Sequence, residues 1–87
     1  MTHQPPAEPL LSQRVAAELR AELARRQWSG RRLAEVSDTP FKTAARHLSG
    51  GSAIPVDALA RYARALDITA IELMRRADGH LSMPASA

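Results

Sequence analysis

The composition of this 87-residue chain predicts an all-α protein. Seventeen residues are Ala, whereas Val and Ile together number six and aromatic residues make up 3%. This mixture favours helices, because strands are rich in β-branched and aromatic side chains. The length allows one domain with a modest core. Since the chain has no Cys, we expect packing alone to stabilise that core, without disulfides or thiolate metal sites.

The distribution of Pro, Gly and periodic apolar residues predicts one folded unit between two terminal segments. Residues 1–10 hold three of the six Pro and show no apolar period, which predicts a flexible N-terminal arm. Residues 78–87 mix Gly, Pro, Ser and Ala and predict a flexible C-terminal tail. The folded domain is therefore expected over residues 11–77.

Two helices are predicted in the first half of this domain. The first is expected to begin after Ser12, a good N-cap residue, and to run to about Arg26. Its apolar residues recur every four positions as one stripe, formed by Val15, Leu19 and Leu23. Ser29 is expected to cap a second, short helix of sequence GRRLAEV, whose inward residues are Leu33 and Ala34.

A third short helix is predicted within the stretch SDTPFKTAARHLSGG, residues 37–51. Thr39 is expected to cap it through its hydroxyl, and Pro40 suits the first helical position, where its missing N–H has no partner to lose. Gly50 or Gly51 is expected to end the helix in the left-handed conformation.

Two further helices complete the predicted fold. The fourth is expected over residues 56–66 and is broken at Asp67. Thr69 and Glu72 then form a capping-box pattern at the start of a fifth helix, which runs to about Arg76.

The basic residues are concentrated in the first half of the chain. Residues 12–50 carry eight basic and four acidic side chains, whereas residues 53–78 carry four of each. A local basic excess attracts nucleic acid, and Arg, which supplies eleven of the twelve basic residues, suits phosphate and base-edge contacts. A GC-rich coding sequence explains abundant Arg and Ala equally well, so the charge alone leaves both interpretations open.

The residue spacing of the third helix predicts a buried and an exposed side. At about 100° per residue, Ala44 and Leu48 fall on one side and are expected to face the core. The opposite flank carries Phe41, Lys42, Ala45, Arg46 and Ser49. Thr43 and His47 fall at the margin, and His47 is expected to be a surface or packing residue. Tyr62, on the fourth helix, is expected in the core with its hydroxyl at the surface.

Residues 28–74 resemble the helix-turn-helix domain of phage Cro and repressor proteins and of the wider Xre-type regulators. The matching features are Ser29 at the start of the second helix, the trio Leu33-Ala34-Glu35, HLSGG at the end of the third, IPVDALARYARALDI and TAIELM. The chain departs from the family pattern where Asp38 replaces the usual Gly of the turn, and where Thr39 and His47 replace apolar residues. The resemblance implies a compact five-helix, lambda-repressor-like fold.

The resemblance also implies that the third helix, about residues 40–49, enters the DNA major groove. Arg46 then suits a bidentate contact with guanine, and Lys42 suits a guanine or a phosphate. Phe41 has two open interpretations, a thymine-methyl contact or a lid on the core. The predicted base-reading residues are Phe41, Lys42, Ala45, Arg46 and Ser49. The predicted phosphate-binding residues are Ser29, Gly30, Arg31, Arg32 and Thr43.

The function that these features predict is sequence-specific double-stranded DNA binding by a transcription regulator. A Cro-like or small repressor of phage or prophage origin, acting by operator occupancy, fits the resemblance. A homodimer through the C-terminal helix is expected, with monomeric binding left open. The residues of that expected surface are Ile71, Leu73, Met74, Leu81 and Met83. The alternative is a protein-interaction adaptor or antitoxin-like partner on the same fold, which would use this apolar C-terminal segment.

Several classes of function are not expected. The chain has no His–carboxylate pair at helical spacing and no phosphate-cradling Gly loop, so we do not expect an enzyme. Its three His are dispersed, and no metal, cofactor or small-molecule ligand is expected. No apolar run reaches the length of a membrane span, so a cytoplasmic protein is expected. The resemblance further implies a nucleoid-associated protein of a bacterial host cell. Six arginines are expected to be solvated, several of them paired with a nearby carboxylate as in Glu22–Arg26 at helical spacing. They are Arg25, Arg26, Arg61, Arg64, Arg75 and Arg76.

Overall fold

The computed structural model describes residues 7–79, with side chains from residue 11 onward, and every regular element in this range is an α-helix. The helices are α1 (Ala7–Arg26), α2 (Gly30–Val36), α3 (Phe41–Ser49), α4 (Val56–Ala65) and α5 (Ala70–Asp78). The predicted all-α fold of five helices is therefore confirmed. Residues 1–6 and 80–87, including Leu81 and Met83, lie outside the described residues.

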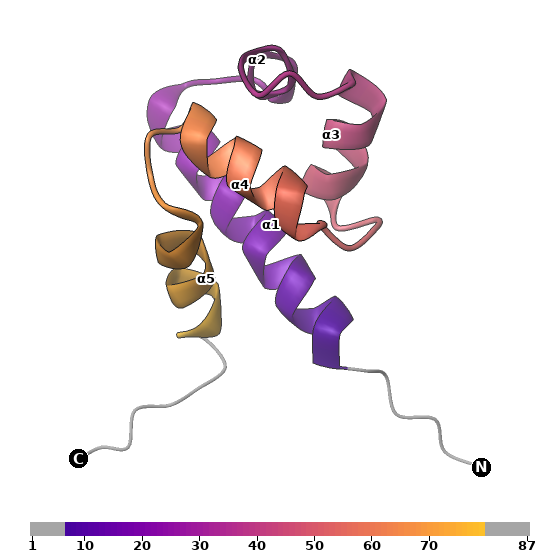
Figure 1. Cartoon of the computed structure of the whole chain (residues 1–87), viewed down its shortest axis with the longest axis vertical. Helices are drawn as coiled ribbons and strands as arrows, with labels where there is room; N and C mark the ends of the chain where they lie inside the picture. The colour runs from indigo at the N-terminus through magenta and orange to yellow at the C-terminus, as the bar shows by residue number, and fades with distance from the viewer. Residues whose placement is uncertain (1–6, 80–87) are drawn as a thin grey trace.

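The helices are arranged around α1, which is the longest (Figure 1). Helix α5 packs along one side of α1 and α3 packs on the other, while α4 crosses in front of it (Figure 1). Helix α2 lies at one end of the molecule and packs against α3 and α4 (Figure 1). The α2–α3 pair therefore lies at the opposite side of α1 from α5.

The core confirms the apolar stripe predicted for α1. Val15, Leu19 and Leu23 are all buried, at 3%, 0% and 5% exposure. They join one cluster that draws side chains from every helix, including Leu33, Ala44, Leu48, Leu59, Tyr62, Leu66 and Leu73. Leu and Ala, with one Val and one Tyr, thus make up the buried core, as the composition predicted.

Helix α1 begins at Ala7, which is earlier than the predicted start after Ser12. Pro9 is compatible with this start because it falls in the first turn, where a missing N–H costs no intrahelical hydrogen bond. Ser12 lies inside the helix, and its hydroxyl accepts the N–H of Ile54 at 3.0 Å. Ser12 therefore tethers the α3–α4 loop to α1 and does not cap the helix.

The α2–turn–α3 segment agrees with most of its predicted local geometry. Ser29 caps α2 by accepting the Arg32 N–H at 3.0 Å. Gly50 ends α3 at φ 81°, and Asp38 adopts φ 56° in the turn. The predicted capping role of Thr39 is wrong: its hydroxyl is buried, and it accepts from the Ser37 hydroxyl and donates to the Ser37 carbonyl. Pro40 occupies the N-cap position of α3, one residue before the predicted place.

The junction of α4 and α5 also follows its local sequence. Asp67 adopts φ 58° where the break was predicted, and the Thr69 hydroxyl accepts the Glu72 N–H at 3.0 Å. The carboxylate of Glu72 accepts hydrogen bonds from Arg75 and Arg76. The capping box is therefore formed on the Thr69 side, whereas the Glu72 carboxylate bonds to these arginines and not to the Thr69 N–H that the prediction assigned to it.

Candidate nucleic-acid interface

The predicted reading face of α3 lies at the surface of the molecule. Lys42, Arg46 and Ser49 are exposed, Phe41 is 39% exposed, and Ala45 is half-buried. Thr43, predicted to contact phosphate, is also half-buried. The side-chain periodicity therefore places these residues where an external ligand can reach them.

The opposite side of α3 is anchored in the core, as predicted. Ala44 is fully buried and Leu48 is 8% exposed. Gly30 of α2 lies so close that an added Cβ would come within 3.1 Å of Leu48 Cδ1. The absence of a side chain at Gly30 thus lets the start of α2 approach the end of α3 closely.

His47 is buried, which confirms the packing alternative of its prediction but corrects its placement at the margin of α3. Its Nδ1 lies 2.6 Å from the hydroxyl oxygen of Tyr62, whose predicted surface position is wrong. Tyr62 is fully buried, so its hydroxyl does not reach the surface. The two rings meet edge to face with centroids 5.8 Å apart. This hydrogen bond satisfies two buried polar groups at once and joins α3 to α4.

The surroundings of this pair favour its neutral form. Burial lowers the pKa of His47 from its usual 6.5, and the positive charges of Arg46 and Arg61 lower it further. Burial raises the pKa of Tyr62 above its usual 10, against smaller opposing effects of Arg61 and the Thr39 hydroxyl. Both side chains are therefore uncharged at neutral pH, and α3 is held to α4 by a neutral hydrogen bond.

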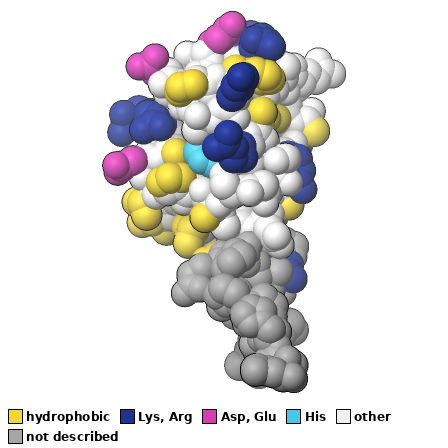
Figure 2. Space-filling view, turned by 90° about the vertical axis from the view of Figure 1, so that its right-hand side faces the viewer, with side chains coloured by type: hydrophobic (Ala, Val, Ile, Leu, Met, Phe, Trp, Pro, Cys, Tyr) yellow, Lys and Arg dark blue, Asp and Glu magenta, His cyan; other side chains and the backbone are white. Residues whose placement is uncertain are grey.

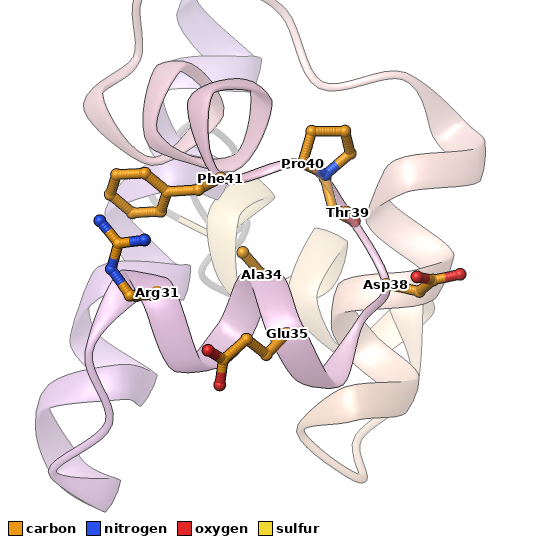
Figure 3. A pocket seen from close by; sticks show the side chains of 7 residues that line it. All are labelled: Arg31, Ala34, Glu35, Asp38, Thr39, Pro40 and Phe41. Carbon is orange, nitrogen blue, oxygen red and sulfur yellow. The ribbon is translucent and has the colours of Figure 1, made fainter.

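Phe41 contacts α2, while the thymine-methyl contact and the lid on the core both remain predictions. The guanidinium carbon of Arg31 lies 4.0 Å from the centroid of its ring, so a cation from α2 covers one face (Figure 3). A shallow pocket between α2 and the start of α3 is lined by Arg31, Ala34, Glu35, Asp38, Thr39, Pro40 and Phe41 (Figure 3). Phe41 thus connects α2 to α3 while part of its ring stays exposed.

Four of the five predicted phosphate-binding residues lie together at the start of α2, whereas Thr43 lies on α3. Ser29 and Arg31 are exposed, as is Arg32, whose guanidinium carbon lies 4.6 Å from the centroid of the Trp28 ring. Stacking holds the plane of a guanidinium while its edge donors stay available for hydrogen bonds. The two α2 arginines are therefore positioned by aromatic rings, which the spacing of the sequence did not reveal.

A second hollow joins the two predicted sets of residues. Its lining comes from three helices and the residue that caps α2, and comprises Arg20, Ser29, Gly30, Arg31, Phe41, Ala45, Leu48 and Ser49. The Ser49 hydroxyl is already engaged, because it donates to the Arg46 carbonyl and accepts the Gly51 N–H. Arg20 of α1 was absent from the predicted site. Nη1 of Arg20 donates a hydrogen bond to the Leu48 carbonyl. The two residues lie 28 positions apart in the sequence, so no local pattern indicated this contact.

The charged side chains of the described part of the chain divide into a paired group and an unpaired group. Glu22 accepts from Arg25, Arg26 and Arg76, which confirms the predicted Glu22–Arg26 pair and links α1 to α5. Hydrogen bonds from Arg25 and Arg26 lower the pKa of Glu22 from 4.5 to about 2, against an opposing effect of burial. The ion pairs of Arg25, Arg26, Arg75 and Arg76 all use Glu22 or Glu72.

The basic side chains of α2 and α3 belong to the unpaired group. Within residues 7–79, Arg31, Arg32, Lys42 and Arg46 form no ion pair with a carboxylate. Figure 2 shows the face on the α3 side of the molecule, where Lys and Arg recur across the described surface and Asp and Glu lie toward its margins. This distribution gives the α2–α3 side a positive surface available to an anionic partner.

The expected dimer surface is only partly exposed. Leu73 is fully buried, so it cannot meet a partner, whereas Ile71 is 79% and Met74 is 36% exposed. An apolar groove beside Met74 adds residues from α1 and α4, and its lining comprises Leu11, Ser12, Val15, Ala53, Ile54, Val56, Leu59 and Met74. The contribution of α1 and α4 to this surface was missed by the sequence analysis.

Residues 7–79 contain neither a candidate metal site nor a candidate membrane-spanning helix. No group of three or more His, Asp or Glu side chains in this range is placed to hold a metal ion. None of the described helices combines the length and the hydropathy that a bilayer crossing requires.

The class that these features define is a small all-α, five-helix domain with a helix-turn-helix at α2–α3. The crystal structure of the clp gene regulator ClgR from C. glutamicum has the same fold, with a TM-score of 0.75 and 22% sequence identity. The match covers 92% of this chain and 99% of that chain. No protein-family model matches the chain, and a search of curated proteins finds no match either.

Proposed function

We propose that this chain is a sequence-specific, double-stranded DNA-binding transcription regulator that places α3 in the major groove. The observation that carries the proposal is the exposed Lys42–Arg46 flank on a helix whose other side is fixed in the core. An α-helix with its side chains is about 10–12 Å across, and the major groove is about 12 Å wide. ClgR, whose structure shares this fold, is a clp gene regulator, and that role supports the proposal.

Two kinds of contact are assigned within this proposal. Arg46 reads a guanine through O6 and N7, and Lys42 reaches a guanine or a phosphate beside it. Arg31 and Arg32 bind phosphates at the start of α2, where the first amides of the helix have no intrahelical partner. Operator occupancy by such a domain blocks polymerase sterically, as in a Cro-like or small repressor.

The proposal is tested by selecting duplexes from a random library and measuring binding by fluorescence anisotropy at several salt concentrations. We expect a preferred sequence and a steep loss of affinity with salt. Arg46→Ala should relax the preference at one base position by about 1–3 kcal/mol, whereas Arg64→Ala, on the exposed side of α4, should change nothing. Unchanged binding in both Arg46→Ala and Lys42→Ala would show that α3 is not the reading helix.

We further propose that two copies pair through the exposed apolar surface of α5 and its neighbours. Val56 and Ile71 are 80% and 79% exposed, and each lines a hollow together with Met74, so the three residues form one apolar surface. Ile71→Glu should turn a dimer into a monomer in sedimentation velocity. Val36→Glu is the matched control, because Val36 is also exposed, at 50%, but lies on α2.

The same surface supports a second candidate function, a protein-interaction adaptor. In that case Ile71 and Val56 would contact a different protein, and the Lys42–Arg46 flank would have no role. The duplex titration separates the two functions, since an adaptor would show neither sequence preference nor sensitivity to Arg46→Ala.

A further inference from the structure

Arg20 connects α1 to the end of the reading helix. It projects from α1, is exposed, and donates a hydrogen bond from Nη1 to the Leu48 carbonyl at 2.5 Å. Leu48 is the penultimate residue of α3, where carbonyl groups lack intrahelical donors and form the negative end of the helix dipole. The positive guanidinium therefore satisfies a carbonyl and balances that end of α3.

The hydrogen-bonding capacity of Arg20 is far from exhausted by this contact. A guanidinium has five N–H donors in a planar fork, and the bond to Leu48 uses one of them. The side chain lines the hollow formed with α2 and α3, whose lining contains no carboxylate. Arg25, Arg26 and Arg76 differ in this respect, since each is paired with Glu22.

We infer that Arg20 is a positioning residue that binds a DNA phosphate while it holds the Leu48 carbonyl. The inference rests on the proposed function and adds α1 to the DNA-binding surface. A guanidinium that bridges a phosphate and the end of α3 couples the depth of the helix in the groove to the DNA backbone. Such a contact is blind to base sequence, so Arg20 contributes to affinity and register but not to base preference.

The test compares Arg20→Gln and Arg20→Lys with Arg64→Gln as a matched control. Gln keeps an N–H donor but removes the charge, and Lys keeps the charge but loses the planar fork. Arg64 is exposed and lies beside the α4–α5 junction, lining a hollow with Asp67 and Thr69. Each variant is titrated with the selected duplex and a scrambled duplex over a range of salt, and its thermal unfolding is recorded.

Arg20→Gln should lower the affinity for both duplexes by the same factor. It should also reduce the magnitude of the slope of log K against log salt concentration by about 1. Arg20→Lys should keep the salt slope of the wild type but bind DNA less tightly. Arg64→Gln should match the wild type in both slope and affinity. A wild-type protein that binds neither duplex would refute the proposed function itself. If the wild type binds and Arg20→Gln keeps its slope, the inference is overturned while the proposed function stands. If Arg20→Gln lowers the unfolding temperature but leaves the salt slope unchanged, the inference is also overturned, because Arg20 then only stabilises the end of α3.

Discussion

The buried hydrogen bond between His47 and Tyr62 leads to a quantitative prediction about the stability of α3. Tyr62→Phe keeps the ring but removes the hydroxyl, which leaves Nδ1 of His47 without its partner at 2.6 Å. Because His47 is only 5% exposed, water cannot readily replace that partner. An unsatisfied buried polar group costs about 1–3 kcal/mol of the free energy of unfolding.

A double-mutant cycle separates this cost from other effects of the substitutions. His47→Leu alone leaves the Tyr62 hydroxyl without its imidazole partner, so it should also destabilise the domain. The double variant His47→Leu/Tyr62→Phe replaces both polar partners with apolar ones, which is close to neutral in many proteins. We therefore expect the double variant to be more stable than the sum of the single losses predicts, by about 1 kcal/mol or more.

Urea and thermal unfolding followed by circular dichroism provide the assay. For a domain of this size, each kcal/mol corresponds to roughly 4–8 °C in the unfolding temperature. If Tyr62→Phe is as stable as wild type, or if the two single losses simply add, the hydrogen bond does not hold α3 to α4 as argued.

The pH dependence of the wild type checks the same pair independently. The pKa of His47 in the folded state lies below its usual 6.5, so the unfolded chain takes up the proton first as the pH falls. Stability from this source is complete above pH 6.5 and declines as the pH falls from 6.5 toward the folded-state value. His47→Leu should flatten this part of the stability profile, and a wild type with a flat profile between pH 7 and 5 would contradict the assignment.

The remaining predictions concern the α1–α5 ion pairs and the backbone of the α2–α3 segment. The pKa of Glu22 in the folded state is about 2, below its usual 4.5. The ionised carboxylate therefore stabilises the fold fully above about pH 4.5, and this stabilisation is lost as the pH falls toward 2. Glu22→Gln should cost on the order of 2–3 kcal/mol in urea unfolding at pH 7 and much less near pH 2; an equal cost at both values would exclude an ionic origin. Gly50→Ala should cost about 1–2 kcal/mol because Gly50 ends α3 at φ 81°. Asp38→Gly should instead stabilise the turn, at φ 56°, by up to about 1 kcal/mol, and a loss there would mean that Asp38 has a role beyond its conformation.

Local sequence was sufficient to predict the helices of this protein and the outward face of α3. Helix periodicity and end signals act over three or four residues, so Ser29 and Thr69 could be assigned as caps without knowledge of the fold. The end of α3 could be narrowed to Gly50 or Gly51. The same periodicity separated Ala44 and Leu48 from Lys42 and Arg46, and the burial of α3 follows that division. The all-α class followed from the composition, because the chain is rich in Ala and Leu and poor in the β-branched and aromatic residues that strands prefer.

Contacts between helices were decided only by the tertiary structure. The hydrogen bond of His47 with Tyr62 joins residues 15 positions apart in the sequence, and that of Arg20 with Leu48 joins residues 28 positions apart. The rotation and spacing of the packed helices determine such contacts, so a short-range sequence pattern does not predict them. The same packing turns Leu73 inward and leaves Ile71 exposed. The sequence by itself therefore determined which helices form and which side of α3 faces outward, whereas the fold decided what holds α3 in place and which distant arginine joins its surface.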